Sequence, residues 1–341
     1  MNLTGYMTAL KWPFVVFCVT ALIGCGLEAK TADMSDKLWA SQQQSAKHFL
    51  DAVSNLAIST GALCQIKSGK QQEEKTKQAW LNAVTAWAPL QGANVGNAKA
   101  AALSWQIQFF PDKKNTTGRK MSRLIQSGGP YSVASLSNES VAVQGLGAME
   151  WLLFDPSNMK DVKTHCSLMV VTSKHLVNSA EALVTSWEIN PWGQTNKNQL
   201  EADALRLLTA QLETAIKSIE IPMGKPGYPK PYQAPFWRSQ QSLTATRENI
   251  AHLRTLYEQI MRPVLIDNGH PELAKRLSVH WLTALESIPE GEGLKALLDT
   301  KAGYRDLITL LNNLEYINIA LREEVGPALG MIVGFNSTDG D

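Results

Sequence analysis

The sequence predicts an all-α fold made of two helical-bundle domains packed side by side, and three observations lead to this. Apolar side chains recur at three- and four-residue spacing, as at Leu205, Leu208 and Leu212. Alternating patterns typical of strands are almost absent. The chain has 341 residues, of which 44% are hydrophobic, so it is long enough for about two cores.

The apolar pattern places ten helices along the chain. They are predicted at residues 36–66, 71–90, 98–109, 115–127, 140–154, 160–188, 197–219, 236–262, 271–286 and 302–325.

Two segments interrupt these helices. Asn190, Pro191 and Gly193 end a helix, so we expect an N-terminal bundle over 36–190 and a C-terminal bundle over 191–341. Residues 221–236 contain five prolines, which forbid a helix and favour an extended, semi-rigid loop. Loops of this length are usually functional or linkers.

The N-terminus predicts export. Lys11 precedes an uncharged, largely apolar stretch over residues 12–24, which is typical of a secretory signal and too short to span a bilayer. The stretch ends in the sequence LIGC at 22–25, which matches the lipobox of bacterial lipoproteins. Residues 1–24 are therefore a predicted lipoprotein signal peptide, Cys25 the predicted lipidation site, and residues 25–35 a flexible polar tether. Gly26 in place of Asp favours the outer membrane. The alternative is an ordinary cleaved signal with a coincidental cysteine.

The remaining cysteines predict a disulfide. Once Cys18 leaves with the signal and Cys25 takes lipid, only Cys64 and Cys166 are left, an even pair in an oxidising compartment. Cys64 is in helical phase with Phe49 and Val53 and so faces inward. Two buried free thiols are the alternative.

Charge and motifs exclude several function classes. The 32 Lys and Arg against 31 Asp and Glu give a net charge of +1, too balanced for non-specific nucleic-acid binding, so we expect no nucleic acid partner. Walker A, G-x-S-x-G, H-E-x-x-H, C-x-x-C and G-x-G-x-x-G patterns are missing. The six histidines are scattered without zinc-like spacing. We predict no catalytic residues from these patterns.

Glu150 is the most unusual residue. It falls within an apolar stripe at helical spacing that includes Val143 and Leu153, and an isolated buried carboxylate is costly unless it is paired, protonated or bound. Gly145 and Gly147 nearby suggest a close backbone approach. Two interpretations stay open: a structural ion pair with Arg119, Lys120 or Arg238, and a carboxylate in a ligand site.

Several stretches together resemble the imelysin-like family, also called the M75 peptidase or iron-regulated protein family. They are residues 79–87, 105–119, 141–155, 236–239 and the C-terminal 329–341. The resemblance runs through nearly the whole mature chain. It implies an envelope protein of two all-α domains, each a four-helix-bundle variant, with a site between them.

One departure from the family concerns its motif G-x-H-x-x-E, which has been proposed to bind metal. Here the motif reads Gly145 to Glu150 with Gly147 in place of the histidine. Glu150 alone offers one oxygen ligand, too few to hold a metal without other ligands. Asp339 and Asp341 are candidate extra carboxylates, although an acidic tail is the simpler interpretation.

The lipobox, the resemblance and the missing histidine together predict a lipid-anchored periplasmic protein that binds a ligand or partner in iron uptake without being an enzyme. Its partners would be the membrane, through the lipid, and other envelope iron-uptake proteins; iron or another divalent metal ion is a candidate cofactor. A metallopeptidase of the M75 type and a structural envelope scaffold are the alternatives. The predicted ligand site, which includes the one candidate metal ligand, Glu150, consists of Trp105, Gln106, Arg119, Glu150, Trp237, Arg238 and Ser239.

Overall fold

The computed structural model of the chain describes residues 16–65, 69–155, 165–291 and 293–331, with side chains from residue 29 onward. Over these residues the ordered elements are helices, and the only β-type pairing is an isolated bridge between Lys225 and Tyr228. This confirms the predicted all-α fold class.

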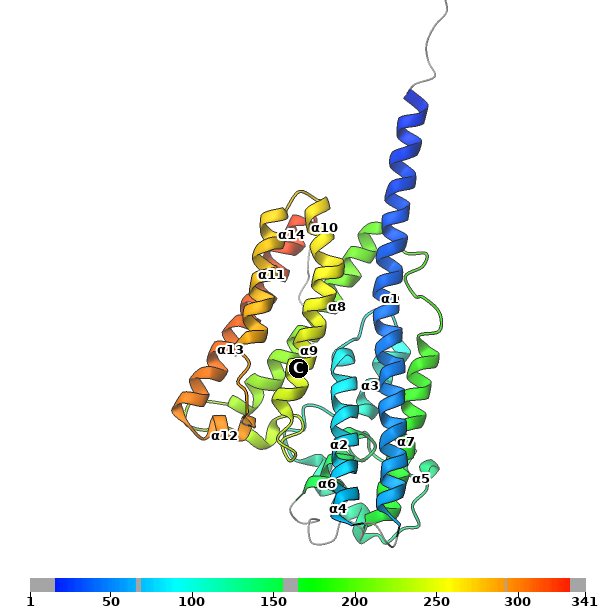
Figure 1. The fold of residues 1–341 in the computed structure, drawn as a ribbon, viewed down its shortest axis with the longest axis vertical. Helices are drawn as coiled ribbons and strands as arrows, with labels where there is room; N and C mark the ends of the chain where they lie inside the picture. The colour runs from blue at the N-terminus through cyan, green and yellow to red at the C-terminus, as the bar shows by residue number, and fades with distance from the viewer. Residues whose placement is uncertain (1–15, 66–68, 156–164, 292, 332–341) are drawn as a thin grey trace, which may run out of the picture.

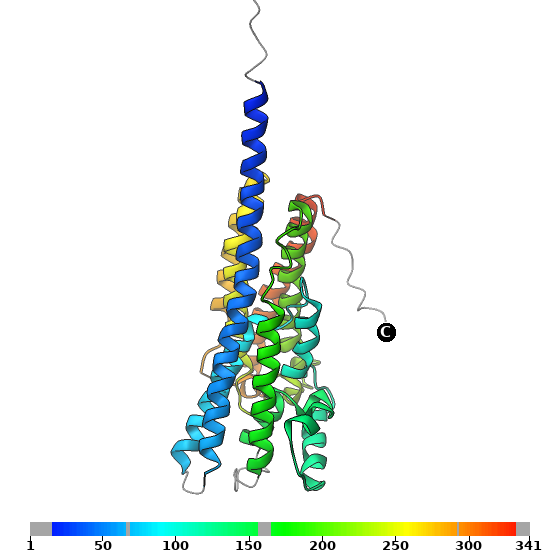
Figure 2. The same ribbon diagram turned by 90° about the vertical axis from the view of Figure 1, so that its right-hand side faces the viewer.

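Three long helices form the first group, in which α1 (Val16–Leu63) packs against α2 (Lys70–Trp87) and α7 (Cys166–Ser186). Helix α1 runs along the long axis of the molecule and projects beyond the other helices at its N-terminal end (Figures 1 and 2). Its inward face carries side chains such as Phe49 and Leu56, both fully buried. Each such side chain stabilises the fold by about 1.5–3 kcal/mol relative to exposure.

Shorter elements fill the chain between α2 and α7. They are η1 (Ala88–Leu90), α3 (Ala98–Ile107), α4 (Thr116–Gln126), α5 (Val133–Ser137), η2 (Val141–Val143) and α6 (Leu146–Phe154). Helix α6 packs against α2, α4 and α7, so it is enclosed on several sides.

The second group consists of α8 (Lys197–Met223), α9 (Ser242–Leu256), α11 (Pro271–Glu286) and α13 (Lys301–Ala320). Helix α8 packs on α9 and α13, and α11 packs on the same two helices. Connecting elements complete this part of the chain: η4 (Pro231–Gln233), the π-helical η5 (Tyr257–Met261), α10 (Arg262–Asp267), α12 (Leu294–Leu298), the π-helical η6 (Leu321–Val325) and α14 (Gly326–Ala328).

Buried amides join the two groups at the end of α2. The side chain of Asn249 on α9 donates to the carbonyl of Ala88 at 2.8 Å, and that of Gln211 on α8 donates to the carbonyl of Pro89 at 2.7 Å. Carbonyls at a helix end lack some of their partners within the helix. The Ala88 carbonyl also accepts from the N–H of Gln91 at 3.2 Å, and the two amides add hydrogen bonds that link the two groups. The division into two domains at residue 190 stays a prediction; the chain there is non-helical between α7 and α8.

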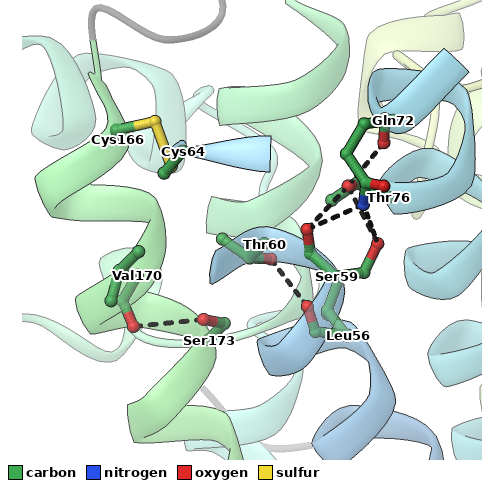
Figure 3. The surroundings of a disulfide bond; sticks show 9 residues. All are labelled: Leu56, Ser59, Thr60, Cys64, Gln72, Thr76, Cys166, Val170 and Ser173. Carbon is green, nitrogen blue, oxygen red and sulfur yellow. Dashed lines mark hydrogen bonds between the residues drawn. A yellow bond between two sulfur atoms is a disulfide. The ribbon is translucent and has the colours of Figure 1, made fainter. Parts of the chain in front are cut away.

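A disulfide bond joins Cys64 to Cys166, as predicted (Figure 3). It links the C-terminal end of α1 to the first residue of α7. Near it, the hydroxyl of the fully buried Thr60 donates to the carbonyl of Leu56. Cys64 itself is partly buried and packs against the core, in agreement with the inward phase predicted for it.

Several sequence predictions need correction. Residues 25–35 were expected to be a flexible tether, but they belong to α1, and Lys30 reaches Asp267 at 2.9 Å. Helix α9 begins at Ser242 instead of residue 236. The helix predicted over 140–154 is divided into η2 and α6, and the short helices α5, α12 and α14 were not predicted.

The lipidation prediction falls where the structure gives little information. Residues 1–15 lie outside the described part, and at Cys25 only the helical backbone is described. Of the described helices, none combines the length and apolar character that crossing a membrane requires.

Candidate functional site

Glu150 lies near the middle of α6 and is 2% exposed. Almost every other residue of this helix is also buried, because α6 is enclosed by α2, α4 and α7. Burial removes the carboxylate from water and raises the pKa of Glu150 above its ordinary value. Nearby hydrogen bonds and the charge of Arg238 oppose this effect without cancelling it.

A tight turn before α9 brings Ser239 to Glu150. Phe236 and Gln240 have positive φ angles of 55° and 63°, and the N–H of Gln241 donates back to the carbonyl of Phe236 at 3.1 Å. The turn directs both the backbone N–H and the hydroxyl of Ser239 at Oε1 of Glu150, at 2.9 and 2.8 Å. Such conformations are uncommon for residues other than glycine, so the surrounding packing must hold them.

Aromatic packing anchors this turn. The Phe236 ring lies edge-on to Trp80, with centroids 5.6 Å apart, and Trp80 also contacts Phe154 at the end of α6. The indole N–H of Trp80 donates to the carbonyl of Leu146 at 3.0 Å. One buried tryptophan therefore fixes both α6 and the turn that contacts it.

Arg238 pairs with Asp155 instead of Glu150. Its Nε donates to Oδ2 of Asp155 at 2.9 Å, and an Nη donates to the side-chain oxygen of Asn115 at 2.8 Å. The guanidinium also lies over the Trp237 ring, 4.4 Å from its centroid. The side chain is only 4% exposed, so these contacts hold Arg238 in place. Of the three candidate ion-pair partners of Glu150, Arg238 therefore pairs with a different carboxylate.

A small cavity of about 40 Å³ adjoins Glu150. Its walls come from the segment after α3, from α4, from α6 and from the turn before α9; they include Phe109, Asp112, Gly147, Tyr232 and Trp237. A volume of this size admits roughly one water-sized group. The cavity could therefore hold a small polar group, while the body of a ligand stays outside.

The two glycines at the start of α6, Gly145 just before the helix and Gly147 within it, have different surroundings. A Cβ atom at Gly145 would lie less than 3.0 Å from the carbonyl oxygens of Gln106 and Ile107, so the expected close backbone approach is present there. At Gly147 a Cβ atom would meet nothing within 4 Å. The expectation is wrong for Gly147, which instead lines the cavity.

The structure brings together four of the seven predicted site residues: Glu150, Trp237, Arg238 and Ser239. Trp105 is 52% exposed on α3 and lines a different cavity. Gln106 touches the site only through its carbonyl, which packs against Gly145. Arg119 is exposed on α4 and does not line the cavity.

Sequence reasoning missed Asn115 and Asp155, which hold Arg238, and Asp112. Asp112 accepts a hydrogen bond from the N–H of Thr117 at 2.9 Å and so fixes the start of α4. Asp155 directly follows the apolar stretch that ends at Phe154, and a carboxylate at that position is the signal that could have indicated a partner for Arg238.

The described residues around Glu150 do not fit a metal ion. Oε1 of Glu150 accepts two hydrogen bonds, Asp155 pairs with Arg238, and Gly147 has no donor atom. Throughout the described part of the chain, no three His, Cys, Asp or Glu residues group closely enough to hold a metal. Asp339 and Asp341 lie outside the described residues.

Comparisons with known proteins agree with this architecture. The family model of imelysin, peptidase family M75, matches residues 42–320. The crystal structure of an imelysin-like protein from Psychrobacter arcticum is similar, with a TM-score of 0.73, 19% identity, and 89% of this chain and 98% of that chain covered. That of an iron-regulated protein A precursor from Parabacteroides distasonis has a TM-score of 0.58 and 14% identity, with 84% and 95% covered. Comparison with curated proteins found no match. Since the family match spans most of the sequence, the chain belongs to the imelysin family.

Proposed function

We propose that the protein is a lipid-anchored, periplasm-facing component of the outer membrane that binds a ligand or a partner protein during iron uptake and does not cleave it. The observation that carries the proposal is Glu150, a buried carboxylate held by Ser239 beside a small cavity. Burying such a group costs free energy that an apolar residue would not cost. A role in binding accounts for its presence.

The chemistry of the site suits recognition. Because burial raises its pKa, Glu150 can donate a hydrogen bond when protonated and accept one when ionised. Tyr232, which is 44% exposed, and Trp237 offer aromatic surface beside the cavity. A partner would insert one small polar group and rest its apolar surface on these rings.

The proposed membrane location rests on the sequence, and the proposed role in iron uptake rests on similarity to a known protein. The lipobox at 22–25 supports lipid anchoring. The Parabacteroides protein of similar fold is described by its name as iron-regulated, which supports a role in iron uptake for this chain.

A metallopeptidase is the less suitable alternative, because the residues around Glu150 lack a metal-binding set. Purified protein should not cleave denatured casein, with or without added zinc or iron. Cleavage by the wild type that is abolished both by a chelator and by Glu150→Gln would establish the peptidase instead.

Growth of a deletion strain under iron limitation tests the proposal. Genes for the wild type, Glu150→Gln and Glu201→Gln would be returned to the strain, with protein amounts checked in the membrane fraction. Glu201 is the control, because it is 5% exposed and burial also raises its pKa, but it lies on α8, pairs with Lys197 at 3.5 Å and does not line the cavity at Glu150.

The wild type and Glu201→Gln should restore growth, and Glu150→Gln should not. Full restoration by Glu150→Gln would contradict the proposal. A deletion strain that grows normally without iron but becomes sensitive to detergent would favour the structural scaffold.

A further inference from the structure

A second cavity, of about 250 Å³, lies next to the one at Glu150 and shares Gln108 and Phe110 with it. Its walls come from the end of α2, the segment between η1 and α3, helix α3 itself and one side of α8. This volume suits a single ring-sized molecule better than a large ligand, since drug-sized ligands occupy roughly 300–1,000 Å³.

No described residue that lines this cavity carries a formal charge. Its polar groups are amides and hydroxyls. A buried charge on a ligand needs a partner of opposite sign, and an unpaired one costs several kcal/mol. The lining therefore favours a neutral ligand over a carboxylate, a phosphate or a metal ion.

Gln91, which lines this cavity, carries a hydrogen-bond donor that no protein group uses. The residue is 8% exposed, and its buried Nε2 atom has no hydrogen-bond partner. A buried donor without a partner costs about 1–3 kcal/mol, and such groups are rare in folded proteins. Gly92 brings this segment close to α8: its φ is +76°, and a Cβ there would collide with the hydroxyl of Thr214.

Hydroxyl oxygens supply acceptors. The hydroxyl of Thr214 donates to the carbonyl of Ala210, and that of Ser104 donates to the carbonyl of Ala101. Each oxygen keeps lone pairs that can accept from a ligand. Gln108 is also fixed, because its Oε1 accepts from the indole N–H of Trp87 at 2.6 Å.

Trp105 supplies a flat apolar wall. Its side chain is 52% exposed although it lies on a helix that packs against the protein core, and it neighbours Phe109 with ring centroids 6.3 Å apart. An exposed tryptophan beside neutral donors and acceptors matches a molecule with one apolar face and a rim of hydroxyl groups.

We propose that this cavity binds a neutral saccharide, with one sugar ring stacked on Trp105 and its hydroxyl groups bonded to the polar side chains of the lining. Gln91 is among these side chains, and its amide rotates toward the ring because Nε2 is enclosed in the structure without ligand. Sugar rings have an apolar C–H face, hydroxyl groups that both donate and accept, and no charge. The proposal is independent of the function proposed for Glu150, because neither Trp105 nor Gln91 lines that cavity.

Saturation-transfer NMR on the purified mature protein tests this. The probes are N-acetylglucosamine, tri-N-acetylchitotriose and maltotriose, with glucuronate as the charged counterpart, each at about 10 mM, which nearly saturates a site with a Kd of about 1 mM or below. Comparing the monomer with the trimers separates recognition of a free sugar from recognition of a glycan chain.

The variants are Trp105→Ala, Gln91→Leu and the control Tyr228→Ala, which removes an aromatic ring that is 77% exposed and does not line the cavity. We expect transfer to at least one neutral saccharide and none to glucuronate. Affinity should fall at least roughly tenfold, about 1.4 kcal/mol, in Trp105→Ala and Gln91→Leu and stay unchanged in Tyr228→Ala.

Three results would overturn the assignment: no transfer to any neutral saccharide, equal transfer to glucuronate, or full affinity in Trp105→Ala. Because Trp105 is exposed, its replacement leaves the fold intact, so the test stands even where Gln91→Leu does not yield folded protein. Folding of each variant is checked by its thermal unfolding midpoint.

Discussion

Glu150 and Ser239 lie 89 residues apart in the sequence and meet at one oxygen atom, Oε1, which accepts hydrogen bonds from both the backbone N–H and the hydroxyl of Ser239. The contact joins α6 to the turn before α9. Serine carries no charge, so at this contact the carboxylate is held by hydrogen bonds alone.

This geometry predicts that Glu150→Gln is well tolerated. The glutamine oxygen can accept both bonds from Ser239, and a neutral side chain avoids the cost of burying charge. Urea unfolding should show a loss of less than about 2 kcal/mol. A loss of about 3–5 kcal/mol, typical of a broken buried ion pair, would mean that the carboxylate has a charged partner after all. Ser239→Ala should cost about 1 kcal/mol, because the backbone N–H bond remains.

Gly145 and Gly147 should respond in opposite directions to alanine. At Gly145 the new methyl group would collide with the carbonyls of Gln106 and Ile107, and the required shift should lower the free energy of unfolding by about 1–3 kcal/mol. At Gly147 it would enter open space within a helix, so stability should rise by about 0.4–1 kcal/mol. Thermal unfolding of the two variants tests this prediction. An equal loss of stability in Gly145→Ala and Gly147→Ala would contradict it.

Removal of the disulfide should destabilise the protein strongly. Cys64 and Cys166 are separated by 102 positions, and closing a loop of that size is worth up to about 4.7 kcal/mol in the chain-entropy model. We expect the double variant Cys64→Ala, Cys166→Ala to lose about 2–4 kcal/mol in denaturant unfolding. Unchanged stability under oxidising conditions would be inconsistent with this prediction. Wild type measured with a reductant serves as the control.

His252 should make stability depend on pH. Burial lowers its pKa from 6.5 to about 4, so the unfolded chain takes up a proton there before the folded chain does. The contribution of neutral His252 to the free energy of unfolding is complete above pH 6.5 and is lost as the pH falls from 6.5 toward 4. It is worth up to about 3 kcal/mol.

The measurement compares the free energy of unfolding of wild type and His252→Leu over a range of pH. The raised pKa values of Glu150 and Glu201 change stability in the opposite direction, but they do so equally in both proteins and cancel in the difference. The difference between the two unfolding curves should change between pH 6.5 and 4. A constant difference would show that His252 titrates normally.

Cys25 should carry lipid in the cell. Wild type should incorporate a fatty-acid probe and fractionate with membranes, and Cys25→Ser should do neither. Cys18→Ser is the control, since Cys18 leaves with the predicted signal. Full labelling of Cys25→Ser would refute the anchor.

The helices were predictable because their apolar faces repeat over many turns, and the disulfide because only two cysteines were left to pair. The turn around Ser239 was not predictable. Phe236 and Gln240 adopt positive φ angles, which their residue types do not indicate. The helix predicted over 236–262 therefore included the site residues that in fact form the turn before α9. Trp105 was placed at Glu150 because both lie in stretches that resemble the family, and only the packing of α3 separates them. Helices as short as α5 and α12 contain too few residues to reveal a period.

The length of α1 determines how far the folded part of the protein would lie from a membrane to which residue 25 is anchored. A helix rises about 1.5 Å per residue, so the stretch from residue 25 to Leu63 spans about 57 Å. If lipid holds residue 25 at a bilayer, α1 acts as a rigid spacer, and the disulfide at its far end links this spacer covalently to α7. The cavities would then stand at a fixed distance from the membrane surface, within reach only of partners that extend equally far into the periplasm.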